Sequence, residues 1–198
     1  FCQHHADLAG AGMSPERVDL ALLATGTLVL IWLSRKSLRH PGRHGFYRFF
    51  VWEAILGLIV LNRQPWGEHP SSVHQGISWV LMLVSIFLVI RGHGALRRQG
   101  AASEARADGT LYAFEKTTAL VTTGIFRYIR HPMYASLLAL TWGVYFQEPS
   151  WPGTALAGIA SLLLVLTARA DENECLAYFG APYAAYMRRT RRFIPYLF

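Results

Sequence analysis

Residues 124–134 read GIFRYIRHPMY, and the apolar stretch ASLLALTWGVYFQ follows directly at 135–147. Arg130 and His131 therefore gather just before Pro132, where a membrane helix is predicted to begin. Proline at the first helical position costs no hydrogen bond, and the free amides beside it make the helix start electropositive. Such a concentration of basic groups is expensive at a membrane unless something anionic binds it. The stretch therefore predicts a site for a carboxylate or a phosphate.

The composition is that of a membrane protein. Of the 198 residues, 53% are hydrophobic and the mean hydropathy is positive, which is too apolar for a soluble domain of this size. Five apolar segments approach the ~20 residues that span a bilayer. They cover residues 18–33, 46–61, 76–90, 133–147 and 153–168. We predict an all-α polytopic membrane fold of about five transmembrane helices. The last two are alternatively a short hairpin, because only residues 148–152 join them.

The basic residues are distributed unevenly between the connecting segments. Residues 34–48, 91–130 and 169–198 together hold 17 Lys and Arg, whereas 1–17, 62–74 and 147–152 hold two. Because cytoplasmic loops carry the excess of basic residues, we expect the N-terminus outside and the C-terminus and active site in the cytoplasm. The formal charge of +7 is then mainly a topology signal and does not indicate nucleic-acid binding. Membrane lipids are the expected partners, and the basic segments also favour anionic headgroups.

We expect one integrated domain with two regions. Residues 1–90 form an N-terminal region of three membrane helices, and 91–198 contain a cytoplasmic connector, the helical hairpin and the cofactor-binding end. Hydrophobic and charged residues recur at steps of three and four within 169–190, which predicts a cytoplasmic helix. Arg169 and Glu172 would share one of its faces. They are either an ordinary helix pair or part of a pocket for a zwitterionic amino acid.

A second motif follows the first by about forty residues. It consists of the acids Asp171 and Glu172, the run FGAPYAAY at 179–186, in which Gly180 is expected to end a helix, and RRFIP at 191–195. The two motifs together resemble the isoprenylcysteine carboxyl methyltransferase and phospholipid methyltransferase superfamily of integral membrane enzymes that use S-adenosylmethionine. The usual glutamate pair of that family begins with an aspartate here, and its shorter side chain weakens a bidentate role.

The resemblance implies cofactor roles for His131, Tyr134 and Glu172. Methyl transfer is an in-line displacement at a carbon bound to a positively charged sulfur, so the enzyme mainly positions its reactants. Arg130, His131 and the helix start at Pro132 suit the carboxylate of S-adenosyl-L-methionine. Glu172 suits its amine or ribose hydroxyls, and Tyr134 offers a hydrogen bond or a ring face to the sulfonium. S-adenosyl-L-homocysteine is the expected product.

Three residues are expected to take part in the reaction itself, namely Glu172, Arg169 and Arg130. A carboxylate or thiolate acceptor needs no base at neutral pH, whereas an amine or a phenol does. Glu172 and Glu53 are the candidates for that base. Glu53 lies inside the second predicted span, where a carboxylate needs a partner or water. Its alternative role is an ion pair with Arg48 or another interfacial base.

The leading hypothesis is a membrane-embedded methyltransferase that acts on a lipid-like or hydrophobic acceptor, such as an isoprenylcysteine carboxylate or a phospholipid amine. One alternative is an NADPH-dependent reductase related to the membrane sterol reductases, which are usually longer. Another is a non-catalytic module that binds anionic lipid, for which His131, Tyr134 and Glu172 would be dispensable. No metal is expected, because the adjacent His4 and His5 cannot both reach one ion without a scaffold. The acceptor and the oligomeric state stay open.

Overall fold

A computed structural model defines the fold of residues 14–64, 72–101 and 116–197. The histidines considered for a metal, His4 and His5, lie outside these ranges. The described elements are α1 (Pro15–Ser34), η1 (Ser37–Arg39), α2 (His44–Leu61), α3 (Val73–Gln99), η2 (Gly124–Arg127), α4 (Pro132–Tyr145), α5 (Trp151–Phe179) and α6 (Ala181–Arg189). All the secondary-structure elements in these ranges are helices, which confirms the predicted all-α class.

Each of the five predicted apolar segments forms a helix, α1 to α5. Four of these helices, α1, α2, α3 and α5, are long and apolar enough to cross a membrane. The fifth, α4, has 14 residues, fewer than the ~20 that an upright span requires. The chain is therefore a polytopic all-α membrane protein. The predicted short hairpin applies to one arm only, since α5 continues for 29 residues.

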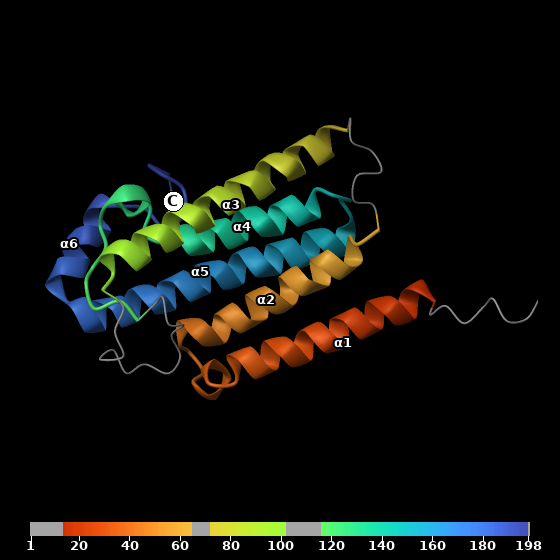
Figure 1. The fold of residues 1–198 in the computed structure, drawn as a ribbon, viewed down its shortest axis with the longest axis horizontal. Helices are drawn as coiled ribbons and strands as arrows, with labels where there is room; N and C mark the ends of the chain where they lie inside the picture. Colours follow the sequence, from red (N-terminus) through yellow and green to blue (C-terminus); the bar gives the residue numbers. More distant parts are fainter. Residues whose placement is uncertain (1–13, 65–71, 102–115, 198) are drawn as a thin grey trace, which may run out of the picture.

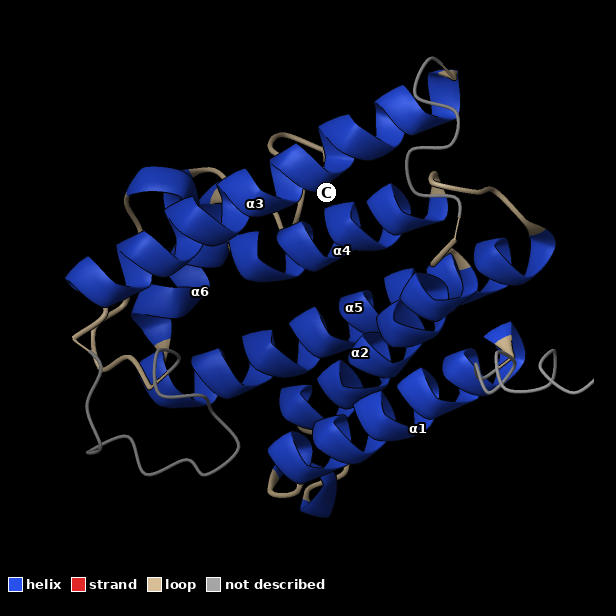
Figure 2. Ribbon diagram, turned by 45° about the vertical axis from the view of Figure 1, so that its right-hand side comes forward, coloured by secondary structure: helices blue, strands red, loops and turns tan. Residues whose placement is uncertain are grey.

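The helices lie side by side in the order α1, α2, α5, α4 and α3, as Figures 1 and 2 show. Neighbours in this row run antiparallel, with α2 packed along α5 and α3 packed along α4. The starts of α2 and α4 therefore meet the ends of α1, α3 and α5 at one end of the bundle, which we call the site end. The first motif precedes α4 and the acids lie late in α5, so the row brings both motifs to the site end.

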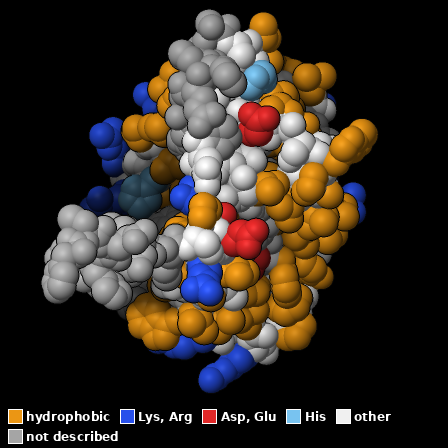
Figure 3. Space-filling model, turned by 90° about the vertical axis from the view of Figure 1, so that its right-hand side faces the viewer, with side chains coloured by type: hydrophobic (Ala, Val, Ile, Leu, Met, Phe, Trp, Pro, Cys, Tyr) orange, Lys and Arg blue, Asp and Glu red, His pale blue; other side chains and the backbone are white. Residues whose placement is uncertain are grey.

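The outer faces of α1 and α3 are apolar and exposed. Large hydrophobic side chains such as Leu28 and Trp32 on α1, and Leu83 and Ile90 on α3, are exposed in the isolated chain. Figure 3 views the bundle from the end opposite the site end and shows hydrophobic side chains along its flanks. Apolar patches of this extent indicate contact with lipid. The exposed faces thus agree with an integral membrane protein.

The short helix α4 ends between its neighbours, and their side chains satisfy its last carbonyl groups. The amide of Asn62 on α2 donates to the carbonyl of Val144 at 2.8 Å, and the hydroxyl of Ser78 on α3 donates to that of Gly143 at 2.6 Å. Asn62 and Ser78 are both buried. Within a membrane an unsatisfied carbonyl group costs several kcal/mol, so irregular backbone is tolerated only where protein groups cover it. These polar side chains allow α4 to stop short.

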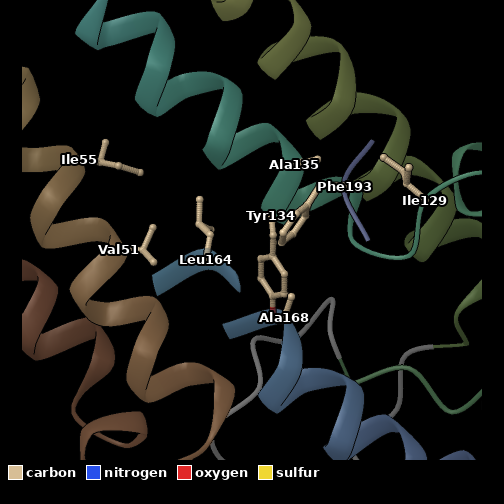
Figure 4. Close-up of a cluster of buried hydrophobic side chains, with 8 residues drawn as sticks. All are labelled: Val51, Ile55, Ile129, Tyr134, Ala135, Leu164, Ala168 and Phe193. Carbon is tan, nitrogen blue, oxygen red and sulfur yellow. The ribbon is translucent and has the colours of Figure 1, made fainter. Parts of the chain in front are cut away.

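A hydrophobic cluster at the site end joins three helices to the C-terminal segment. Val51 of α2, Leu164 of α5 and Tyr134 of α4 belong to it, together with Phe193. Figure 4 shows the ring of Tyr134 between Phe193 and Ala168. The packing of Tyr134 therefore links the first motif to α5 and to the end of the chain.

The contact between α3 and α4 requires a glycine at position 143. A Cβ atom there would lie 2.9 Å from Met82 Cγ and 3.4 Å from the Ser78 carbonyl oxygen. We expect Gly143→Ala to lower the thermal unfolding temperature in detergent, because the two helices must move apart at a cost of about 1–3 kcal/mol. Gly158→Ala on α5 is the matched control, since no described atom lies within 4 Å of a Cβ there. Equal effects of the two substitutions would contradict the α3–α4 contact.

Candidate active site

A pocket of about 110 Å³ lies at the site end. Its wall includes residues of α2, α3, α4, α5 and α6 and of the segment 117–126. The residues from the two sequence motifs are Phe126, Arg130, His131, Pro132, Met133, Tyr134, Asp171, Phe179, Tyr183 and Tyr186. Both motifs, which lie far apart in the sequence, thus contribute to one pocket.

Short backbone pairing fixes the first motif against the C-terminal segment. The amide of Arg130 donates to the carbonyl of Arg191 at 2.7 Å, and the amide of His131 donates to that of Arg192 at 3.1 Å. Residues Ile129 and Arg191 form an isolated parallel bridge. Buried backbone groups need such partners. The segment after α6 is therefore a structural part of the site.

Glu172 is buried and binds two arginines. Its Oε1 atom lies 2.8 Å from Arg130 Nη2, and its Oε2 atom lies 2.8 Å from Arg192 Nη2. The Arg130 guanidinium also donates to the carbonyls of Met187 and Thr190, where α6 ends. Only 4% of the Glu172 side chain is exposed, and it is not part of the pocket wall. The carboxylate therefore joins α5 to both motifs.

Gly180 separates α5 from α6. Its φ of +64° lies in the region that favours glycine, and the chain turns there so that α6 crosses the site end (Figure 1). The turn brings Tyr183 and Tyr186 to the pocket, where the Tyr186 hydroxyl donates to the carbonyl of Phe126 at 2.7 Å. The predicted helix end at Gly180 is confirmed. The single helix predicted over 169–190 is wrong, because α5 continues through its first half and α6 is separate.

His131 and Asp171 are charged partners in the pocket wall. His131 Nδ1 lies 3.4 Å from Asp171 Oδ2, and its ring stacks on Tyr134 with centroids 5.3 Å apart. Burial alone would lower the pKa of His131, but the carboxylates of Asp171 and Glu172, each 3.4 Å from one of its ring nitrogens, raise it above its ordinary value. The pocket therefore presents an imidazole ring beside a carboxylate, which favours the protonated form of the ring. A zwitterionic ligand could find partners for both of its charges there.

The structure does not bring two of the predicted residues to the pocket. Arg169 is exposed, and the partners of Glu172 are Arg130 and Arg192. Side chains three residues apart on a helix point in neighbouring but different directions. Of these two, only the Glu172 side chain points to the buried cluster. Glu53 lies between α1 and α2, where its Oε2 atom accepts a hydrogen bond from Thr27 at 2.8 Å.

Sequence reasoning gave no role in the site to two further pocket residues, Cys175 and His44. Cys175 lies four residues after Asp171 and donates to its Oδ1 atom at 3.6 Å, so helical periodicity could have placed it on the same face. His44 begins α2, and its Nδ1 atom lies 2.8 Å from Glu174 Oε2. No sequence signal connects it to a site more than eighty residues later. The described residues contain no cluster of His, Cys, Asp and Glu that could hold a metal ion.

Comparison with known proteins identifies one family. The model of the family described as phospholipid methyltransferase matches residues 74–179. This match covers more than half of the chain, including the first motif and both acids at 171 and 172. It ends before α6 and the C-terminal segment. No curated protein and no solved structure matches the chain.

The different surroundings of the two adjacent acids predict different effects on stability. Glu172→Gln leaves two arginines without their carboxylate, and removing one partner of a buried ion pair costs about 3–5 kcal/mol. Asp171→Asn changes a partly exposed side chain and should cost clearly less. Thermal unfolding in detergent checks this order, and an Asp171→Asn protein that is the less stable of the two would contradict the buried role of Glu172.

The surroundings of His131 also predict a pH dependence. Because the pKa of His131 is raised in the folded protein, its contribution to stability is fully present below the unfolded pKa of about 6.5 and is lost as the pH rises through the folded pKa. The unfolding temperature of the wild type should therefore fall more steeply above that pH than the unfolding temperature of His131→Gln. Parallel curves for the two proteins would show that His131 does not titrate in this way.

Proposed function

The chain belongs to the phospholipid methyltransferase family, and we propose that it transfers a methyl group from S-adenosylmethionine to a hydrophobic acceptor. The observation that carries this proposal is the pairing of His131 with Asp171 in the wall of a pocket with aromatic sides. The family match favours methyl transfer over a nicotinamide-dependent reduction and over lipid binding without catalysis. Membrane lipids surround such a protein, and its acceptor is expected to come from them.

The charged residues of the pocket fit the amino-acid end of the cofactor. The Nε2 atom of His131 is buried and faces Glu172 Oε1 at 3.4 Å without a hydrogen bond to the described part of the chain, so a ligand carboxylate that enters the pocket could accept one from it. Asp171 offers an acceptor to the ammonium group. Pro132 begins α4 beside them, and a helix start adds amide groups that favour an anion. We therefore assign His131, Asp171 and Pro132 to cofactor binding.

The aromatic residues of the pocket fit the sulfonium and the exclusion of water. The rings of Phe179 and Tyr183 stack with centroids 6.5 Å apart, and Tyr134 lies within hydrogen-bonding reach of Asp171. Ring faces attract a cation and are not nucleophilic. The bound cofactor supplies a methyl group on a sulfur that leaves readily, so these residues need only hold and orient it.

The pocket is smaller than the whole cofactor requires. Its 110 Å³ is below the ~300–1,000 Å³ of typical small-molecule sites. The adenosine part must therefore extend through the mouth of the pocket, or α6 must move outward. Leu96, Leu120 and Met133 supply an apolar wall that suits a lipid-like acceptor.

Arg130 and Arg192 act on the reactants indirectly, through the parts of the site that they hold in place. Arg130 lines the pocket, but its guanidinium is bound by Glu172 and by α6. Glu172, Arg130 and Arg192 are therefore positioning residues, which hold the first motif and the C-terminal segment in place. Arg169 is exposed and is left without a role in this arrangement. The site end carries the basic connecting segments, so we place it in the cytoplasm.

Calorimetric binding of S-adenosylhomocysteine to the detergent-purified protein tests the proposal. We expect the wild type to bind it, and His131→Ala and Asp171→Asn each to weaken binding at least about tenfold, or ~1.4 kcal/mol. Arg169→Gln is the matched control and should bind like the wild type. Absence of binding by folded wild-type protein, in detergent and in nanodiscs, would overturn the methyltransferase assignment. Unchanged binding by both pocket variants would overturn the assigned site.

A further inference from the structure

The last described residues, 188–197, combine exposed cations with exposed apolar side chains. The exposed cations are Arg188, Arg189 and Arg191. The apolar side chains are those of Ile194, Tyr196 and Leu197, which are 47%, 82% and 78% exposed. The segment contains no acidic residue. Exposed apolar residues of this size next to arginines are typical of chains that lie in a membrane interface.

The position of this segment agrees with such a role. Figure 1 shows the end of the chain beside α3 in the half of the bundle that holds α6, and the backbone pairing of residues 191 and 192 with Arg130 and His131 joins the segment to the site end. The flank of α3 exposes Phe87 and Ile90, and its end exposes Arg97 and Arg98. The change from apolar to basic residues along α3 marks the level of the membrane surface. The C-terminal segment lies near this level.

We propose that residues 188–197 bind the surface of a bilayer that contains anionic phospholipid. The three arginines contact lipid phosphates, and the side chains of Ile194, Tyr196 and Leu197 enter the boundary of the acyl chains. Clusters of arginine beside a membrane prefer anionic to zwitterionic lipid because of their charge. The apolar side chains add an attraction that does not depend on lipid charge.

Binding at this surface would act on the pocket through the same segment. The carbonyls of Arg191 and Arg192 accept hydrogen bonds from the first motif, and the Arg192 side chain binds Glu172. Phe193 is buried in the cluster that contains Tyr134. A membrane that binds the two ends of residues 188–197 therefore also stabilises the hydrogen bonds between Arg191, Arg192 and the first motif. Anionic lipid would stabilise the assembled site.

Hydrogen–deuterium exchange of the full chain tests the proposal in nanodiscs of phosphatidylcholine alone and of phosphatidylcholine with phosphatidylglycerol. We expect the anionic lipid to slow exchange in residues 188–197 by roughly tenfold. The combined substitution of Arg188, Arg189 and Arg191 by Gln should abolish this difference. The same substitution of Arg35, Lys36 and Arg39, which lie at the site end between α1 and α2, should preserve it.

Equal exchange in the two lipids, or a difference that survives the substitution of Arg188, Arg189 and Arg191, would overturn the proposal. A folding defect in this variant is detected from its thermal unfolding. In that case Tyr196→Gln with Leu197→Gln provides the second test, and it should raise exchange of the segment in both lipids. Unchanged exchange would then count against the proposal. The exchange readout needs no cofactor or acceptor, so it is independent of the proposed methyl transfer.

Discussion

The buried contact of Glu172 with Arg130 and Arg192 is the interaction on which the rest of the site depends. It joins the middle of the chain, α5 and the C-terminal segment, which approach one another only in the folded protein. Burying Glu172 and Arg130, with Arg192 only partly exposed, is unfavourable unless each charge finds partners. The two arginines occupy both carboxylate oxygens, and the end of α6 supplies carbonyl groups to Arg130. The cluster therefore forms only when α5, α6 and the first motif are all in place.

Two neighbouring acids consequently have different tasks. Glu172 faces the arginines and is nearly inaccessible, whereas Asp171 lines the pocket beside His131. In the proposed cofactor site Asp171, the shorter acid, binds the ligand, whereas Glu172 binds the arginines that connect parts of the protein. This division explains how a strongly basic site end can present a negatively charged group to a cationic ligand. Arg130 and Arg192 share the single carboxylate of Glu172 and so have a partner within the protein rather than in the cofactor.

The periodicity and the length of the apolar segments were sufficient to predict α1 to α5, and the glycine at 180 was sufficient to predict the end of α5. The early end of α4 was beyond such reasoning, because it depends on Asn62 and Ser78, which reach its carbonyls from other helices. The same is true of the site. Motif resemblance selected His131 and Tyr134, which lie in the pocket wall. Helical spacing wrongly paired Arg169 with Glu172, since the partners of Glu172 come from forty-two residues earlier and twenty residues later in the chain.

In the proposed site His131 and Asp171 hold the amino-acid end of the cofactor, while Glu172 stays bound to its two arginines. An experimental structure of the protein with S-adenosylhomocysteine tests this arrangement most directly. We expect the ligand ammonium group within hydrogen-bonding distance of Asp171, the ligand carboxylate at His131 and the start of α4, and an intact contact of Glu172 with Arg130 and Arg192. A ligand whose ammonium group is bound by Glu172, or one that lies outside this pocket, would contradict it.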